Sequence, residues 1–182
     1  MIFFTADTHF YNKEHLRIGH RYFGNWQEKQ EYIISQWNGV VSPTDEIYLL
    51  GDISDGTGEE TNQVLSRLNG TKYLIIGNHD FYLDDPDFDQ SLYVWARQYH
   101  ELYTMNQKFV LFHFPLEVWS GYRNDRFHLH GHLHRPAPVY EPIRRYEAGI
   151  DAHDGRPVPI DAIWERLTGF HNADRGVPGF ED

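Results

Sequence analysis

Groups that can bind metal ions recur at five places in this 182-residue chain, mostly just after short apolar runs. The five segments are, in order, Asp7-Thr8-His9, Gly51-Asp52, Gly77-Asn78-His79-Asp80, His113 and Gly131-His132-Leu133-His134. Four of them directly follow apolar runs at residues 2–4, 47–50, 73–76 and 110–112, which are typical of buried strands. Because strand ends hold side chains rigidly, this order predicts a single site assembled at the ends of several strands.

The first half of the chain alternates predicted strands with predicted helices. Asn25 and Glu28 have the spacing of a capping box, and apolar residues recur at helical spacing over residues 25–40. Thr57 and Glu60 predict a second box before a shorter helix that ends near residue 69. This alternation is typical of βαβ units on a largely parallel sheet.

The second half has a different pattern. We expect a helix over residues 91–100, then short strands near residues 101–105, 108–113, 127–130, 139–140 and 145–150, and a last helix over residues 161–167. Tight turns and prolines between the short runs favour antiparallel pairing in a second sheet. We predict a single domain over residues 1–167 and a loosely ordered C-terminal tail over residues 168–182.

Composition excludes several classes of function. A formal net charge of -11 argues against broad binding to nucleic acid, which requires a basic surface. The chain has no cysteine, so disulfides, thiolate ligands and a cysteine nucleophile are excluded. The apolar N-terminal run is short and leads straight into Asp7, so we expect a first strand, no membrane segment and a cytoplasmic location.

The residue types favour a centre with two divalent metal ions. Two cations about 3.5–4 Å apart can activate water and stabilise both sides of a displacement at phosphorus. A carboxylate such as that of Asp52 can bridge them, since it has two oxygens. Ligands with nitrogen and oxygen but no sulfur suit Mn²⁺, Fe²⁺, Zn²⁺, Co²⁺ or Ni²⁺, and this chemistry does not choose among them. Manganese is the ion that we favour. The candidate ligands are Asp7, His9, Asp52, Asn78, His113, His132 and His134.

Other residues are candidates for proton transfer and substrate binding. His79 follows the ligand Asn78 and is free for acid–base chemistry, with Asp80 as the carboxylate that orients it. Arg135, beside His134, can grip a phosphate oxygen together with Asn78.

Each of these residues also has an ordinary explanation when it is taken alone. Aspartate is common in turns, and His113 could be a packed core histidine. We expect His128 and His130 to be packed strand histidines. Trp119 and Tyr122 could stack a base or pack between elements, and Asp151 could support the metal loop or cap a strand. The order and strand context of the whole set favour the metal site.

Taken together, the segments resemble the motifs of the calcineurin-like metallophosphoesterase superfamily, which are D-x-H, G-D, G-N-H-D/E, H and G-H-x-H. Phe4-Thr5-Ala6-Asp7-Thr8-His9-Phe10 and Ala148-Gly149-Ile150-Asp151 resemble its small, capless bacterial and phage members. The resemblance spans residues 1–167. It implies an α/β fold, a four-layer α/β/β/α sandwich of two mixed sheets, with the site at the strand ends.

The resemblance also implies roles for the residues that match the motifs. Asp7, His9, Asp52 and His134 would hold one metal, and Asp52, Asn78, His113 and His132 the other. A metal-bridging hydroxide would attack phosphorus, and His79, paired with Asp80, would protonate the leaving alkoxide.

The chain departs from the family pattern at three places. Tyr11-Asn12 stand where the small members often have Gly-His, with His15 a little later. Residues 51–55 lack the arginine of the protein phosphatases, and the stretch from His113 to Gly131 is too short for a capping domain. These departures disfavour a protein phosphatase and predict an open site.

We therefore expect a phosphodiesterase that acts on small or cyclic nucleotides. The sequence leaves open a phosphomonoesterase, a nuclease on single-stranded DNA ends, and a non-catalytic binding scaffold on the same fold. The expected partner is a small phosphoester substrate rather than an extended nucleic acid or a membrane. The oligomeric state is open.

Overall fold

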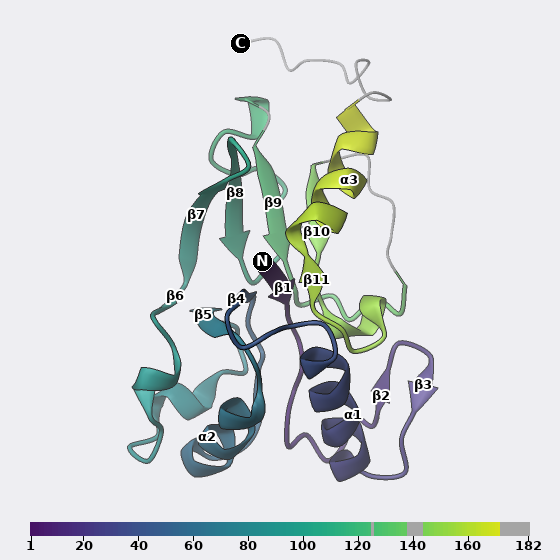
Figure 1. The fold of residues 1–182 in the computed structure, drawn as a ribbon, viewed down its shortest axis with the longest axis vertical. Helices are drawn as coiled ribbons and strands as arrows, with labels where there is room; N and C mark the ends of the chain where they lie inside the picture. The colour runs from purple at the N-terminus through teal and green to yellow at the C-terminus, as the bar shows by residue number, and fades with distance from the viewer. Residues whose placement is uncertain (125, 138–143, 172–182) are drawn as a thin grey trace.

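A computed structural model describes residues 1–124, 126–137 and 144–171, with the backbone alone for residues 169–171. Within these residues, two mixed β-sheets pack with three α-helices (Figure 1). The prediction of an α/β fold with two mixed sheets is therefore confirmed.

The first sheet contains the parallel strands that the sequence predicts. Its strand order is β11-β1-β4-β5-β6, with β11 antiparallel to β1 and the other neighbours parallel. The strands are β1 (Ile2–Thr5), β4 (Glu46–Leu49), β5 (Thr71–Ile75), β6 (Ala96–Arg97) and β11 (Val158–Pro159). Because side chains alternate along a strand, Phe3 and Phe4 point to opposite faces and belong to two separate hydrophobic clusters.

The second sheet has the strand order β10-β9-β8-β7. Its strands are β7 (Tyr99–Thr104), β8 (Gln107–Phe112), β9 (Phe127–His130) and β10 (Arg145–Glu147). β7 and β8 form an antiparallel hairpin, whereas β8, β9 and β10 are parallel. The expected antiparallel pairing therefore holds for the hairpin alone among these strands.

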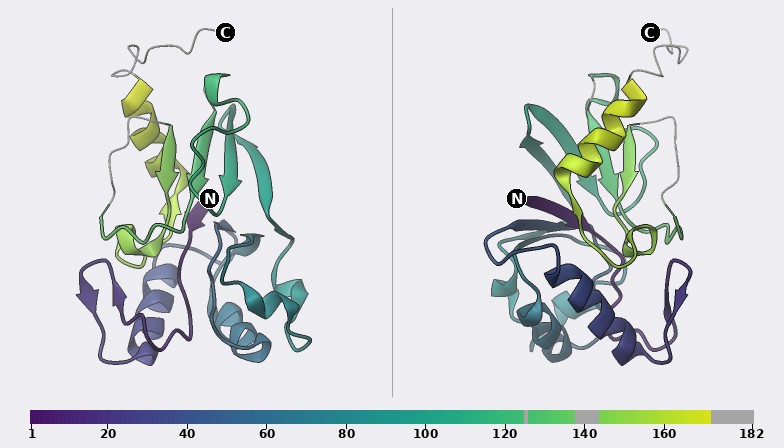
Figure 2. Two further views of the ribbon diagram at one scale, coloured as in Figure 1. Left: turned by 180° about the vertical axis from the view of Figure 1, so that it is seen from behind. Right: turned by 45° about the vertical axis from the view of Figure 1, so that its right-hand side comes forward.

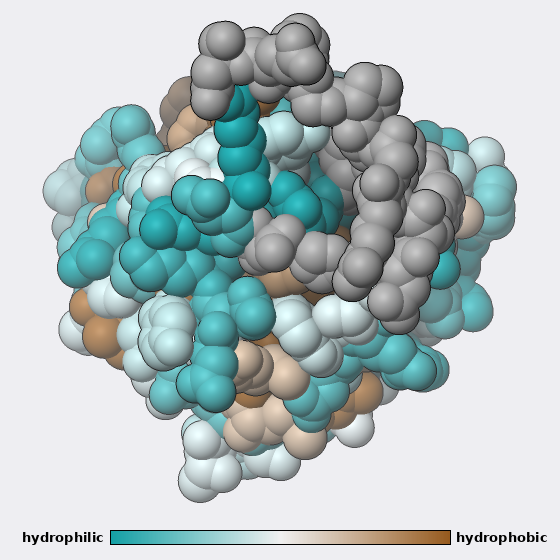
Figure 3. Space-filling model, turned by 90° about the horizontal axis from the view of Figure 1, so that it is seen from above, coloured by the Kyte–Doolittle hydropathy of each residue, from teal (hydrophilic) through white to brown (hydrophobic). Residues whose placement is uncertain are grey.

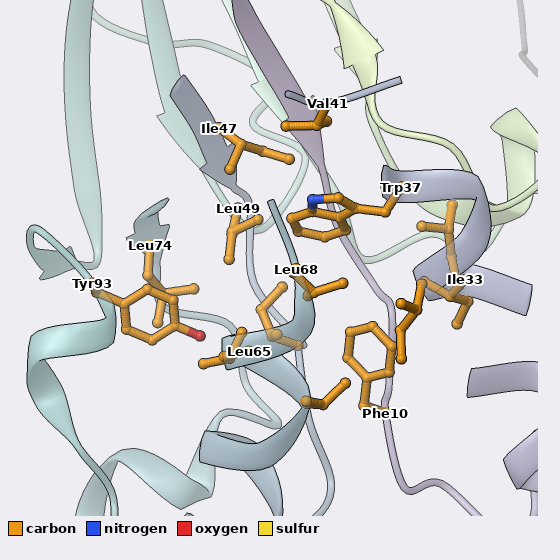
Figure 4. Packing of buried hydrophobic residues seen from close by; sticks show 14 of the residues in the cluster. Phe10, Ile33, Trp37, Val41, Ile47, Leu49, Leu65, Leu68, Leu74 and Tyr93 are labelled. Carbon is orange, nitrogen blue, oxygen red and sulfur yellow. The ribbon is translucent and has the colours of Figure 1, made fainter. Parts of the chain in front are cut away.

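Two helices cover one face of the first sheet. α1 (Trp26–Asn38) starts where Asn25 Oδ1 accepts the Glu28 backbone N–H, and α2 (Gly58–Arg67) starts with the Thr57–Glu60 capping box. Both predicted helix starts are confirmed. Trp37 from α1 and Leu65 from α2 pack with strand residues such as Ile47 in the first hydrophobic cluster (Figure 4).

The second hydrophobic cluster lies between the two sheets and extends to α3 (Ile160–His171). Trp164 of α3 packs edge-on against Phe109 of β8 and Phe127 of β9. Figure 2 shows α3 running along the second sheet, while α1 and α2 lie at the opposite end of the molecule. The helix continues to His171, so the first residues of the predicted tail are helical.

Short elements complete the described chain. They are the hairpin of β2 (Arg17–Ile18) and β3 (Arg21–Tyr22), and the 3-10 helices η1 (Phe81–Asp84), η2 (Gln90–Leu92), η3 (Tyr122–Asn124) and η4 (Ile150–His153). The strand predicted at residues 139–140 lies outside the described residues.

The helix predicted over residues 91–100 is wrong. The chain instead leaves η2 and extends along β5, where Val94 N donates to Lys72 O and Ile76 N to Arg97 O. Without this segment, the edge of β5 would carry unpaired backbone groups. Pairing with those groups outweighs the local helical preference of the segment.

Among the coloured residues on the face seen from above, hydrophilic ones predominate, with hydrophobic residues between them (Figure 3). Over the described residues, no helix combines the length and apolar character that crossing a bilayer demands.

Trp37→Ala is expected to lower the free energy of unfolding by about 3–5 kcal/mol. The Trp37 side chain is fully buried, and its Nε1 donates to Asn69 O at 3.0 Å. Urea denaturation followed by far-UV circular dichroism measures the effect. Tyr22→Ala, at a residue that is 78% exposed, is the control and should change stability by less than about 0.5 kcal/mol. Equal losses in the two variants would contradict the assigned core.

Candidate metal centre

The candidate residues converge because the strands before them are parallel. Asp7 follows β1, Asp52 follows β4 and Asn78 follows β5, so all three leave the first sheet at its carboxyl edge. His113 and His132 follow β8 and β9 of the second sheet in the same way. The two edges meet where Asp7 accepts the His132 backbone N–H at 2.9 Å and 3.0 Å.

The backbone at this junction is strained. Five of the candidate ligands have positive φ: Asp7 (59°), His9 (43°), Asp52 (58°), His132 (75°) and His134 (49°). Residues with a Cβ adopt this left-handed conformation rarely, and they keep it only where the surroundings impose it. Backbone hydrogen bonds hold it here, among them Asp7 N to Gly51 O and His9 N to Asp52 O. Such clustering of strain is typical of a functional site.

Glycines in the motifs allow the loops to approach one another closely. A Cβ on Gly77 would lie 2.2 Å from Asp52 Oδ1, and one on Gly131 would lie 2.7 Å from Asp7 Oδ2. No side chain can occupy either position without moving a carboxylate. This explains the glycine that precedes both the Asn78 and the His132 segments.

The candidate ligands form two compact groups. Asp7, His9 and His134 make the first, and Asp52, His113 and His132 make the second, with the ligand atoms of each group within 4.8 Å of one another. Asn78 Oδ1 joins the second group at 2.9 Å from His113 Nε2. Asp52 Oδ2 lies 3.3 Å from His113 Nε2 and 3.7 Å from His9 Nε2, so it faces both groups. Among the described residues, all seven predicted ligands therefore meet at one place.

Three of the four candidate histidines are oriented as metal ligands usually are. The Nδ1 atom of His9 lies 2.9 Å from Asp55 Oδ2, that of His134 lies 2.8 Å from Asp151 Oδ2, and that of His113 lies 2.8 Å from Leu50 O. A partner on Nδ1 fixes the ring and leaves Nε2 for the metal. The clustered oxygen and nitrogen ligands thus fit a divalent cation.

Nearby positive charge affects the pKa of both carboxylates at the centre. Burial raises the pKa of Asp7 to about 6, although the nearby His134 and His113 oppose that rise. Burial acts to raise the pKa of Asp52, but the hydrogen bond and the charge of His113 outweigh the effect of burial. The pKa of Asp52 is therefore below its usual value. A cation between the groups favours the ionised form of both carboxyls.

The structure places Asp80 differently from the prediction. Its carboxylate is buried and accepts backbone N–H groups of Asp52, Ile53 and Gly77 at 3.1, 2.8 and 2.7 Å. The expected pairing of Asp80 with the His79 ring is replaced by Asp55, whose Oδ1 lies 3.5 Å from His79 Nδ1. Asp80 is a structural link between two loops because both of its oxygens are engaged by the backbone.

Sequence reasoning missed two residues near the centre. Asp55 contacts both His9 and His79, and its position three residues after Asp52 was the available signal. The ring of His15 lies 5.2 Å from that of His134 and belongs to a further group with His134 and Asp151. His15 Nε2 is buried and has no hydrogen-bond partner among the described residues. Its position six residues after His9 carries no recognisable spacing.

Several candidates take the structural role that the sequence left open. Trp119 is buried, packs edge-on against Tyr122 and donates through Nε1 to Arg126 O. His128 is buried, and its Nδ1 lies 3.0 Å from Val110 O. Trp119 and His128 also pack against each other, and neither belongs to the two ligand groups.

Comparison with known proteins identifies a family. A family model described as calcineurin-like phosphoesterase matches residues 1–177. An uncharacterized protein of Methanocaldococcus jannaschii is 27% identical over 169 residues, which are 89% of this chain and 88% of that protein. The gene 66 protein of Mycobacterium phage L5 is 25% identical over 200 residues, covering 94% of this chain and 96% of that protein.

A solved structure shares the fold. It belongs to a protein of unknown function from Aquifex aeolicus, and it matches with a TM-score of 0.66 and 21% identity. The match covers 91% of this chain and 98% of that one.

Asp52→Asn is expected to weaken divalent-cation binding at both groups of ligands, by more than about tenfold, because one carboxylate faces both. Isothermal titration with Mn²⁺ measures the affinity and stoichiometry. Asp85→Asn, at the carboxylate that accepts the Gly58 N–H, changes the same residue type away from the centre and should bind Mn²⁺ as the wild type does. An unchanged titration for Asp52→Asn would refute its shared role.

Proposed function

The chain belongs to the calcineurin-like phosphoesterase family, and we propose that it is a dinuclear metal-dependent hydrolase of small phosphodiesters such as nucleotides or cyclic nucleotides. The observation that carries the proposal is the position of Asp52 Oδ2 between His9 of one ligand group and His113 of the other. A carboxylate shared in this way allows two cations to be held close together.

We assign the ligands of the two cations by group. Asp7, His9, His134 and Asp52 would hold one ion, and Asp52, Asn78, His113 and His132 the other. Mn²⁺ is the ion we propose, because the set combines imidazole with carboxylate and amide oxygen. When bound, such ions lower the pKa of water and stabilise negative charge on the phosphoryl group.

His79 is the proposed general acid. Its side chain is 49% exposed, and its ring lies 5.2 Å from that of His9, so it borders the ligand groups and still reaches solvent. The His79 backbone N–H donates to Asp52 Oδ1 at 2.8 Å, which fixes the residue beside the metal centre. Asp55 lies close to Nδ1 and can orient the ring so that Nε2 gives its proton to the leaving oxygen.

Arg135 is the proposed contact for a phosphate oxygen that is not transferred. It follows His134, and its Nε lies 3.7 Å from Glu147 Oε2. Burial raises the pKa of Glu147 to about 7, although Arg135 opposes that rise. Glu147 thus helps to position the Arg135 guanidinium. Asn78, which follows β5 of the first sheet, lies at the same centre beside His113.

Two features support a diester rather than a phosphoprotein as substrate. The segment that links β4 to α2 carries Asp55 and lacks the arginine that protein phosphatases place there. The connection from β8 to β9 inserts only η3 among its described residues, so no capping domain is inserted at this point of the chain. The intact set of ligands favours an enzyme over a non-catalytic scaffold.

We expect Mn²⁺-loaded protein to hydrolyse bis(p-nitrophenyl) phosphate with a higher kcat/KM than p-nitrophenyl phosphate. Release of p-nitrophenolate measures both rates, and chelator-treated protein is the control. Rapid turnover of the monoester with no turnover of the diester would show that the proposed preference is wrong.

His79→Asn is expected to bind Mn²⁺ as the wild type does but to hydrolyse alkyl esters about 10²–10⁴-fold more slowly. The loss should be smaller for p-nitrophenyl esters, because p-nitrophenolate leaves without a proton. A series of leaving groups of increasing pKa measures the dependence. His20→Asn, at an exposed residue outside both ligand groups, is the matched control. An equal loss for every leaving group would argue against proton donation.

A further inference from the structure

Two phenylalanine rings face solvent at the edge of the metal centre. Phe81 is 74% exposed and Phe114 is 39% exposed, and no other phenylalanine with a described side chain is exposed. Each ring contacts a candidate site histidine. The ring of Phe81 lies 6.1 Å from that of His79, and the ring of Phe114 lies 4.6 Å from that of His132.

The backbone under each exposed ring is firmly anchored. Phe81 stands between Asp80, which binds three backbone N–H groups, and Tyr82, whose buried hydroxyl lies 2.8 Å from that of Tyr93. These anchors hold the backbone that carries the Phe81 side chain.

Phe114 is fixed in a similar way. It follows the fully buried His113, whose Nδ1 donates to Leu50 O, and precedes Pro115. Two residues later, Leu116 N donates to His128 Nε2 at 3.1 Å. An exposed aromatic ring on an anchored backbone beside a polar centre is typical of a surface that binds a planar ligand group.

We propose that Phe81 and Phe114 form an aromatic rim that selects phosphodiesters carrying planar ring groups, as nucleotides do. The proposal rests on the proposed function, because it assigns the substrate class of the same site. Phe81 borders His79, the proposed proton donor, and so it contacts the leaving group. Phe114 borders His113 and His132, and so it contacts the group that stays on phosphorus.

Two esters with the same leaving group separate these contacts. Thymidine 5′-(p-nitrophenyl phosphate) and methyl p-nitrophenyl phosphate differ only in the retained group. Phe114→Ala should lower kcat/KM about tenfold for the thymidine ester and leave the methyl ester unchanged, as expected for the loss of one stacking contact. Phe81→Ala should lower kcat/KM for both esters by the same factor, because both release the same aryl group.

Tyr103→Ala, at a residue that is 63% exposed on β7, is the control for removal of an exposed aromatic ring and should leave both esters unaffected. Phe81→Leu and Phe114→Leu keep apolar bulk and should reproduce the alanine effects if stacking is the cause. Unchanged kinetics in the phenylalanine variants, or equal loss of both esters in Phe114→Ala, would overturn the aromatic rim.

Equilibrium binding distinguishes failure of this inference from failure of the proposed function. With Mn²⁺ present, thymidine 5′-monophosphate should bind more tightly than methyl phosphate, and Phe114→Ala should remove the difference. A protein that hydrolyses neither ester would refute the proposed function, and the binding comparison would still decide whether the rim exists. Equal affinities of wild type for the two monophosphates would overturn it.

Discussion

The buried carboxylate of Asp80 holds together the two loops on which the metal centre depends. Its oxygens accept hydrogen bonds from backbone N–H groups in the loop after β4 and in the loop after β5. Both loops lie beyond the paired residues of these strands. A buried carboxylate is costly unless its hydrogen bonds are made, so these loops stay together as long as Asp80 stays ionised and bonded. Asp52 and His79 are placed by the same loops, and the positions of a proposed shared ligand and a proposed acid follow from one structural residue.

Around this link, the chain uses strain and close approach to bring the ligands together. The left-handed backbone at Asp7, Asp52 and His132 turns each chain sharply at the end of its strand. Gly77 and Gly131 remove the Cβ atoms that would separate the loops. Asp55 and Asp151 then fix the rings of His9 and His134. The candidate ligands are thus held in place by other residues, as a site of fixed geometry requires.

The aromatic residues divide between packing and exposure in a way that bears on substrate choice. Trp119, in the segment after β8, packs against His128 of β9 and stabilises that segment. Phe114, at the start of that segment, projects to solvent beside His132. The buried ring therefore supports the loop, and the exposed ring is the one available to a ligand.

Local patterns in the sequence predicted the parallel strands, both helix caps and the seven candidate ligands, because each depends on neighbouring residues or on the order of strand ends. The helix predicted over residues 91–100 was wrong, since the pairing of Ala96 and Arg97 with β5 is a contact between residues far apart in sequence. The same reason explains Asp80 and Asp55. The packing of two loops decides which carboxylate lies beside the His79 ring. Adjacency in sequence favoured Asp80, whereas the structure places Asp55 there.

The sequence by itself determined the types of candidate ligand, their order and the family, because metal chemistry restricts the residues that can serve. Only the tertiary structure decided the partner of each imidazole, the placing of Asp52 between two groups and the exposure of Phe81 and Phe114. These depend on contacts across tens of residues, where the packing of the sheets, and not the local pattern, sets which groups meet.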